Sequence, residues 1–168
     1  GTPQGGIISP TLANIALNGI EKALSGFKQT TRNGVAYNPK VSLIRYADDF
    51  IITGASKEIL ENELKPILVE FFQERGLELS EEKTVITHVS EGFDFLGFNV
   101  RKYNGTLLTK PSKKSVKKLT EKVKVLLKSH RAVKQEEILM MLNPILTGWS
   151  MYYRYCAASE TFRKTDQK

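Results

Sequence analysis

Apolar and polar residues follow each other along the chain in a pattern that changes once, near residue 110. Before that point, short apolar or alternating runs typical of strands lie between segments with the three-to-four-residue periodicity of amphipathic helices. After it, only the helical periodicity continues. The pattern therefore predicts an α+β module over residues 1–110 and an all-helical module over residues 111–168.

Two amphipathic helices are predicted in the first module. The first begins at Ser9-Pro10, a pair typical of a helix N-terminus, and runs to about residue 24. The second covers residues 57–75 and ends at Gly76. Pro66 lies inside this second segment and predicts a kink, because proline has no backbone N–H to donate.

Short strands are predicted between and after these helices. Residues 41–46 and 50–53 flank Ala47-Asp48-Asp49, which predicts a hairpin with two carboxylates at its tip. Residues 26–40 are polar and indicate a loop or a ragged hairpin. Asn104-Gly105 is a strong hairpin signal between the last two strands. The further strand-like segments are 77–79, 84–89, 93–101 and 106–109.

Three helices are predicted in the second module. The first is rich in lysine opposite an apolar stripe, the second begins near Ile138, and the third covers residues 144–156. Trp149, Tyr152 and Tyr153 share one face of the third helix. Base stacking is one use of such aromatic residues, but their helical spacing favours packing in a core.

The formal charge of +7 is unevenly distributed along the chain. Residues 1–100 carry 9 basic and 13 acidic residues, whereas residues 101–168 carry 16 basic and 5 acidic residues. A net charge of +11 in the last third favours a polyanionic partner such as nucleic acid, with a solubilising basic surface as the alternative. The single cysteine, Cys156, excludes an internal disulfide framework and a cysteine-rich zinc site, and it favours an intracellular protein.

The ends and the apolar runs of the chain carry two further expectations. No apolar run approaches the ~18 residues that span a bilayer, which excludes an integral membrane protein with spanning helices. The chain begins at Gly1 without a Met or a signal segment, so we expect it to be a piece of a longer protein.

Asp48 and Asp49 are candidate metal ligands. Neighbouring side chains of a regular strand point to opposite faces, so these two can share a site only where the backbone turns. Two ionised carboxylates at close range repel each other unless cations lie between them. Mg²⁺ binds one or two carboxylates together with substrate phosphates, and a pair of such ions supports in-line phosphoryl transfer. An ordinary exposed turn is the alternative for this dipeptide.

Five segments resemble, in order, the motifs of reverse transcriptases. Tyr46-Ala47-Asp48-Asp49 resembles the Tyr-x-Asp-Asp motif of the palm, and Pro3-Gln4-Gly5 resembles the block that precedes it. Glu82-Lys83-Thr84 is similar to the following block, and Phe95-Leu96-Gly97-Phe98 is similar to the primer-grip hairpin. Residues 148–162 resemble the helical thumb, or maturase domain, of group II intron-encoded proteins. The chain is thus identified as a member of that family, covering part of the polymerase palm and the thumb.

The resemblance implies a role for each matching residue. Asp48 and Asp49 would bind two catalytic Mg²⁺ ions, for which Mn²⁺ could substitute. The residues implied at the nucleotide are Gln4, Gly5, Tyr46 and Lys83. The residues implied in the primer grip are Phe95, Leu96, Gly97 and Phe98. The residues implied to contact the nucleic-acid backbone are Lys113, Lys114, Lys117, Lys118 and Lys122. A solvated lysine remains the alternative for Lys83, and plain strand core the alternative for the two phenylalanines.

The implied function is that of an RNA-directed DNA polymerase, which extends a primer 3′-OH with deoxynucleoside triphosphates on an RNA template. The implied partners are the RNA template, the DNA primer, dNTPs and intron RNA, in a bacterial cytoplasm or an organelle. In this family a further metal-binding Asp and the fingers precede the Pro-Gln-Gly block, so we expect the chain alone to be inactive. The alternatives are a non-enzymatic RNA-binding maturase with a vestigial palm, and a generic basic nucleic-acid-binding module, which leaves the acidic hairpin unexplained.

Overall fold

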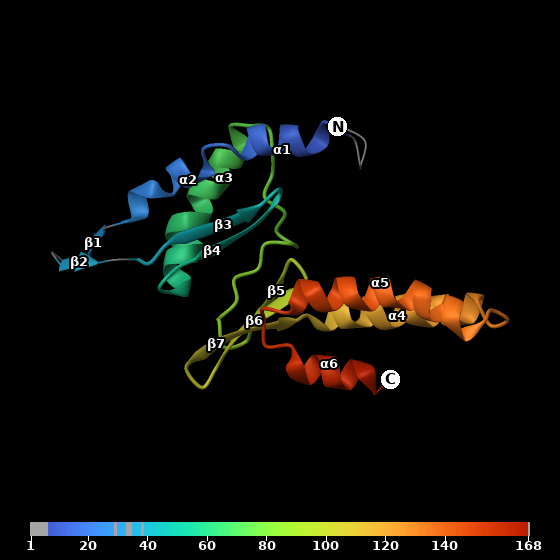
Figure 1. The fold of residues 1–168 in the computed structure, drawn as a ribbon. Helices are drawn as coiled ribbons and strands as arrows, with labels where there is room; N and C mark the ends of the chain where they lie inside the picture. Colours follow the sequence, from blue (N-terminus) through green and yellow to red (C-terminus); the bar gives the residue numbers. More distant parts are fainter. Residues whose placement is uncertain (1–6, 29, 33–34, 38, 168) are drawn as a thin grey trace. The chain divides into compact units, whose positions relative to one another are not determined.

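The computed structural model describes residues 7–28, 30–32, 35–37 and 39–167 (Figure 1). The chain forms two compact units, Gly1–Ile86 and Thr87–Lys168. Both contain helices and antiparallel strands, and the predicted α+β class is confirmed. The last three strands lie in the same compact unit as the C-terminal helices, whereas the domain boundary predicted from the sequence is at residue 110.

The first predicted helix is interrupted. Helix α1 (Ser9–Leu17) and helix α2 (Ile20–Ala23) are separated at Gly19, and a 3₁₀ turn, η1 (Ser25–Lys28), follows. The prediction of one continuous helix to residue 24 was wrong. Gly19 has φ of +93°, a left-handed conformation that glycine adopts at little steric cost and that ends the helical path.

The second predicted helix is a π-helix, η2 (Ile59–Leu64), followed directly by helix α3 (Lys65–Gln73). The sequence predicts a kink at Pro66, and the structure shows a change of helix type just before it, between Leu64 and Lys65. Pro66 is the second residue of α3, directly after the π-helix, and has no backbone N–H to donate to the preceding turn. Gly76 follows the helix with φ of +64°, as the predicted end of this segment requires.

Two antiparallel hairpins complete the strands of the first unit. Strands β1 (Thr30–Arg32) and β2 (Val35–Tyr37) pair within the region predicted as a loop or ragged hairpin. Strands β3 (Ser42–Tyr46) and β4 (Asp49–Thr53) form the predicted acidic hairpin.

The core of the first unit lies between the helices and one face of the β3–β4 hairpin. Phe50 stacks on Phe72 of α3 with 6.0 Å between ring centroids, and Leu43 and Ile52 pack against the same cluster. Full burial of an apolar side chain contributes about 1.5–3 kcal/mol, and Leu43, Phe50 and Ile52 are partly buried. The buried members of the cluster are Leu17, Ile20, Leu24, Ile59, Leu64, Leu68, Phe71 and Phe72.

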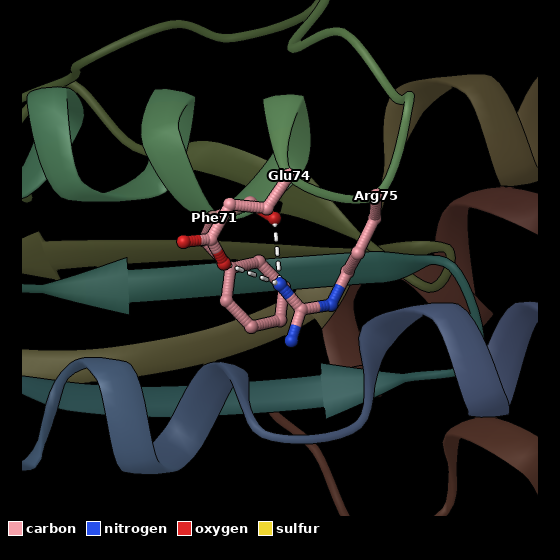
Figure 2. A network of polar contacts seen from close by, with 3 residues as sticks. All are labelled: Phe71, Glu74 and Arg75. Atoms are coloured by element: carbon pink, nitrogen blue, oxygen red, sulfur yellow. Dashed lines mark hydrogen bonds and ion pairs between the residues drawn. The ribbon is translucent and has the colours of Figure 1, made fainter.

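Arg75 closes the C-terminal end of α3 (Figure 2). Its guanidinium carbon lies 3.6 Å from the centroid of the Phe71 ring, and its Nη1 donates to the Phe71 carbonyl at 2.8 Å and to Glu74 Oε2 at 3.3 Å. The last carbonyls of a helix have no intrahelical donor, and a cation beside them also complements the helix dipole. Arg75 thus stabilises the helix that supports the acidic hairpin.

Residues 77–92 contain turns and irregular backbone but no strand, so the strands predicted at 77–79 and 84–89 were wrong. The carbonyl of Ser80 accepts hydrogen bonds from the N–H groups of Lys83 and Thr84, which closes a turn through this polar segment. Val85 is 74% exposed, and no described strand pairs with these residues. An apolar pattern forms a strand only where a neighbouring strand satisfies its backbone.

The second unit begins with a three-stranded antiparallel sheet of order β5-β6-β7, formed by β5 (Phe93–Phe95), β6 (Phe98–Tyr103) and β7 (Thr106–Pro111). The single strand predicted over 93–101 is divided by a turn at Leu96-Gly97. The predicted Asn104-Gly105 hairpin is confirmed, with φ of +45° and +87° at its two turn residues.

Three helices follow the sheet: α4 (Lys113–Ser129), α5 (Gln135–Tyr153) and α6 (Ser159–Asp166). Ser112 caps α4, since its side chain accepts a hydrogen bond from the Ser115 N–H at 3.1 Å. Helix α5 continues through Pro144, so the division into two helices before residue 144 was wrong. Proline there removes the N–H that would donate to the Met140 carbonyl. Across the part of the chain that the structure describes, no helix has the length and apolar character needed to cross a membrane.

Candidate active site and nucleic-acid interface

Asp48 and Asp49 lie at the tip of the β3–β4 hairpin. Tyr46 pairs with Asp49 in the ladder, so only Ala47 and Asp48 form the turn. Ala47 has φ of +53°, a left-handed conformation typical of a two-residue hairpin turn. The backbone turn that two adjacent carboxylates need in order to share a site is therefore present, and both side chains are exposed.

Arg45 holds this turn from the core-facing side of β3. Its Nη1 donates to the backbone carbonyl of Ala47 at 3.3 Å and to Asn14 Oδ1 of α1 at 3.1 Å. Arg45 was missed in the sequence. The available signal was its position in the strand. Arg45 is two residues after Leu43 and so lies on the same face, which packs against the core and where an apolar side chain is expected.

The donor set at the hairpin tip suits a hard cation. Mg²⁺ prefers carboxylate oxygens and keeps several water or phosphate ligands, which an exposed tip leaves room for. Among the described residues no cluster of three or more His, Cys, Asp or Glu side chains is arranged to hold a metal ion. Asp48 and Asp49 thus supply two carboxylates whose chemistry fits a hard cation.

Tyr46 lies on the outer face of the same hairpin. It is 64% exposed, and Ile44 on the same face is 54% exposed. Asp49 is the cross-strand partner of Tyr46, so the tyrosine ring and this carboxylate are neighbours. Of the other residues predicted at the nucleotide, Gln4 and Gly5 lie outside the described residues. Lys83 is exposed in the turn after Ser80, and no hydrogen bond or ion pair given for the described residues joins it to the hairpin.

The predicted primer-grip residues lie around a second tight turn, in the second unit. Phe95 pairs with Phe98, so Leu96 and Gly97 form the turn, with φ of +48° and +83°. The Gly97 carbonyl accepts hydrogen bonds from the Ser112 N–H at 2.8 Å and from the Tyr153 hydroxyl at 2.9 Å.

The aromatic residues of α5 pack against this turn. The prediction of a core position is confirmed for Tyr153, which is 3% exposed. Tyr152 is 54% exposed, yet its ring stacks on Phe98 at 5.1 Å and its hydroxyl donates to the Leu96 carbonyl at 2.9 Å. Burial raises the pKa of Tyr153 above its ordinary value, with a smaller opposing effect of the hydrogen bond to Ser115. The Tyr153 hydroxyl therefore stays protonated at neutral pH.

The lysines predicted to contact the nucleic-acid backbone all lie on α4 and are all exposed, and they are Lys113, Lys114, Lys117, Lys118 and Lys122. Leu119 is 5% exposed and packs on the opposite side of the helix. Lys117 and Glu121 form an exposed ion pair at 3.8 Å, which contributes little. Lys118 and Lys122 also line an open groove of about 480 Å³ with Trp149 and Tyr152 of α5. Ammonium groups beside an open groove suit phosphate contacts that carry no sequence information.

Comparison with known proteins agrees with this arrangement. Residues 1–100 match the family described as "Reverse transcriptase (RNA-dependent DNA polymerase)", and residues 116–168 match "Group II intron, maturase-specific domain". Protein YkfC of Escherichia coli (strain K12) is 34% identical over 122 residues, covering 58% of this chain and 31% of that protein. Group II intron-encoded protein LtrA of Lactococcus lactis subsp. cremoris is 27% identical over 187 residues, covering 80% of this chain and 31% of that protein.

The chain spans about a third of the length of these curated relatives. The match to the reverse transcriptase family covers more than half of the chain, and the maturase match follows it in the order that the sequence motifs predict. The chain therefore belongs to the reverse transcriptase family, as a group II intron-encoded reverse transcriptase/maturase.

Proposed function

We propose that this chain supplies the catalytic hairpin and the thumb of an RNA-directed DNA polymerase encoded by a group II intron. The reaction joins the 3′-oxygen of a DNA primer to the α-phosphorus of a dNTP on an RNA template and releases pyrophosphate. The observation that supports it most is the tight turn that presents Asp48 and Asp49 together at an exposed hairpin tip, in a chain that belongs to this family.

The carboxylates of Asp48 and Asp49 would hold two Mg²⁺ ions, together with a third carboxylate from outside the described residues. When bound, such ions stabilise both the attacking and the leaving oxygen of the displacement. Arg45 keeps the turn closed through the Ala47 carbonyl, so that the two carboxylates stay at the tip. The exposed ring of Tyr46, beside Asp49, would support the primer end.

The remaining contacts of the substrate are proposed from the family motifs. Gln4 and Gly5 would line the pocket of the incoming nucleotide, and Lys83 would neutralise the triphosphate or protonate the leaving pyrophosphate. The turn at Leu96-Gly97 would contact the primer. The exposed lysines of α4 would contact phosphates of the template–primer duplex or of intron RNA. In functional terms, residues 1–110 would serve as palm and residues 111–168 as thumb.

Primer extension on an RNA template with Mg²⁺ tests the proposal, using the full-length protein and its Asp48→Asn variant. Loss of an inner metal ligand exceeds the 10–100-fold effects of outer-shell partners, so we expect extension to fall at least about 100-fold. Glu63→Gln is the matched control, because it removes one exposed carboxylate charge from η2. Equal extension by the wild type and Asp48→Asn would refute the assignment of Asp48.

The second candidate is a maturase that binds and folds intron RNA without polymerising DNA. The match of residues 116–168 to the maturase-specific domain favours it, because that domain and the basic surface of α4 require no catalytic hairpin. Intact RNA binding with no extension by either the wild type or Asp48→Asn would establish this second candidate.

A further inference from the structure

Two neighbouring tyrosines of α5 hold the turn between β5 and β6. The Tyr152 hydroxyl donates to the carbonyl of Leu96 and the Tyr153 hydroxyl to the carbonyl of Gly97, each at 2.9 Å. Both rings contact Phe98, the next residue, with centroid distances of 5.1 and 4.9 Å. Both carbonyls of the turn and the residue after it are therefore fixed by one end of α5.

The hydrogens in this network have only one consistent arrangement. The Gly97 carbonyl can only accept, so the single hydroxyl hydrogen of Tyr153 is committed to it. The 2.7 Å contact between Tyr153 Oη and Ser115 Oγ then uses the Ser115 hydrogen, while Trp149 Nε1 donates to Ser115 Oγ at 3.3 Å. The Ser112 N–H occupies the second lone pair of the Gly97 oxygen. The result is a directed chain of hydrogen bonds that ends on the turn, an arrangement in which each bond strengthens the next.

The turn also has no spare room at this point. Gly97 has φ of +83°, and a Cβ added to it would lie 2.7 Å from Tyr153 Oη. Leu96 has φ of +48°, a conformation that side-chain-bearing residues seldom adopt. Tyr153 is only 3% exposed, so its hydroxyl acts on the backbone of the turn and not on a bound substrate.

We propose that Tyr153 is a positioning residue, which holds the Leu96–Gly97 turn in the geometry that meets the primer backbone. The inference rests on the proposed polymerase function, which places the primer at this turn. Tyr152 supports the same turn from its exposed side. Removing the Tyr153 hydroxyl leaves the ring packed against Phe98 and Trp149, so we expect the variant to fold and to show its defect in nucleotide transfer.

Pre-steady-state incorporation of one nucleotide, with primer–template in excess over the full-length protein, tests this role. Tyr153→Phe should lower the burst rate about fivefold, the size expected for one hydrogen bond, with an unchanged burst amplitude. Tyr155→Phe is the matched control: it removes the same atom from a side chain that is 85% exposed and whose hydroxyl accepts from Arg154. A wild-type burst rate in Tyr153→Phe, or a loss confined to the amplitude, would overturn the proposal.

A double-mutant cycle supplies a second readout. Gly97→Ala should slow incorporation more in the wild type than when it is combined with Tyr153→Phe, because the phenylalanine lacks the oxygen that the new Cβ would meet. Additive effects would contradict the proposed contact.

If the wild-type protein transfers no nucleotide, the proposed polymerase function is refuted, and the contact between Tyr153 and the turn is then tested without an activity assay. Amide hydrogen exchange of residues 95–98 then decides whether the tyrosine holds the turn. Faster exchange in Tyr153→Phe than in Tyr155→Phe supports the proposal, and equal exchange overturns it.

Discussion

Replacing Arg45 with methionine tests how the catalytic hairpin is kept in shape. Methionine retains an unbranched apolar stem but removes the guanidinium that donates to the Ala47 carbonyl and to Asn14 Oδ1. The Ala47 carbonyl belongs to the two-residue turn that carries Asp48. We expect the turn to sample more open conformations in Arg45→Met, so that the two carboxylates meet a pair of metal ions less often.

The magnitude follows from two weak interactions. One nitrogen, Arg45 Nη1, makes both contacts, at 3.1 and 3.3 Å, and both hydrogen bonds are exposed to solvent, so together they contribute about 1 kcal/mol. The left-handed conformation of Ala47 costs about 1–2 kcal/mol, which is of similar size. A loss of about 1 kcal/mol corresponds to an approximately fivefold increase in the Mg²⁺ concentration that gives half-maximal activity.

The assay is a Mg²⁺ titration of primer extension by the full-length protein. Asn14→Ala is the comparison, since it removes the contact to α1 and leaves the bond to the turn carbonyl in place. We expect a clear increase in the Mg²⁺ requirement for Arg45→Met and less than half of that increase, on a logarithmic scale, for Asn14→Ala. Equal Mg²⁺ requirements in Arg45→Met and the wild type, with equal active fractions, would refute the reasoning.

Two further predictions concern stability. Arg75→Ala removes a cation–π contact and a helix-end hydrogen bond. In hydrogen exchange it should lower the opening free energy of the α3 amides by about 1–2 kcal/mol, and Arg75→Lys should lower it less. Unchanged exchange in Arg75→Ala would contradict this role. Because the pKa of Tyr153 is raised in the folded state, its hydroxyl contributes fully to the free energy of unfolding below the unfolded-state pKa of about 10. This contribution is lost as the pH rises through the higher folded-state pKa. Chemical denaturation from pH 8 to 11 should therefore show a difference between the wild type and Tyr153→Phe that is constant up to about pH 10 and shrinks above it; a difference that grows with pH would refute the sign.

The features predicted correctly from the sequence depend on neighbours in the chain. The acidic hairpin follows from two apolar runs around a short polar turn, and the Asn104-Gly105 hairpin from residues that tolerate positive φ. The strand predicted at 84–89 failed because the apolar pattern does not reveal whether a partner strand exists. Helix α5 continues through Pro144, because proline removes one N–H donor while the other turns of this 19-residue helix keep theirs.

The residues missed at the candidate site act over long separations in the chain. Arg45 reaches Asn14 across 31 positions, and the Tyr153 hydroxyl reaches the Gly97 carbonyl across 56. Periodicity placed Tyr153 in a core, and its ring is buried as predicted. Periodicity could not show that the Tyr153 hydroxyl donates to a carbonyl of the turn, because that partner depends on how the sheet and the helix pack in the folded protein.

The two turns proposed to meet the substrate share one construction. Each is a two-residue hairpin turn whose first residue carries a side chain yet adopts left-handed φ, +53° at Ala47 and +48° at Leu96. In each, a side chain from outside the turn donates to the carbonyl of its first residue: Arg45, two positions before Ala47, and Tyr152, 56 positions after Leu96. Such a conformation costs about 1–2 kcal/mol and persists only where surrounding contacts fix it. Because side chains outside each turn donate to its carbonyls, the turn conformation does not depend on hydrogen bonds from the groups proposed to contact metal ions and nucleic acid.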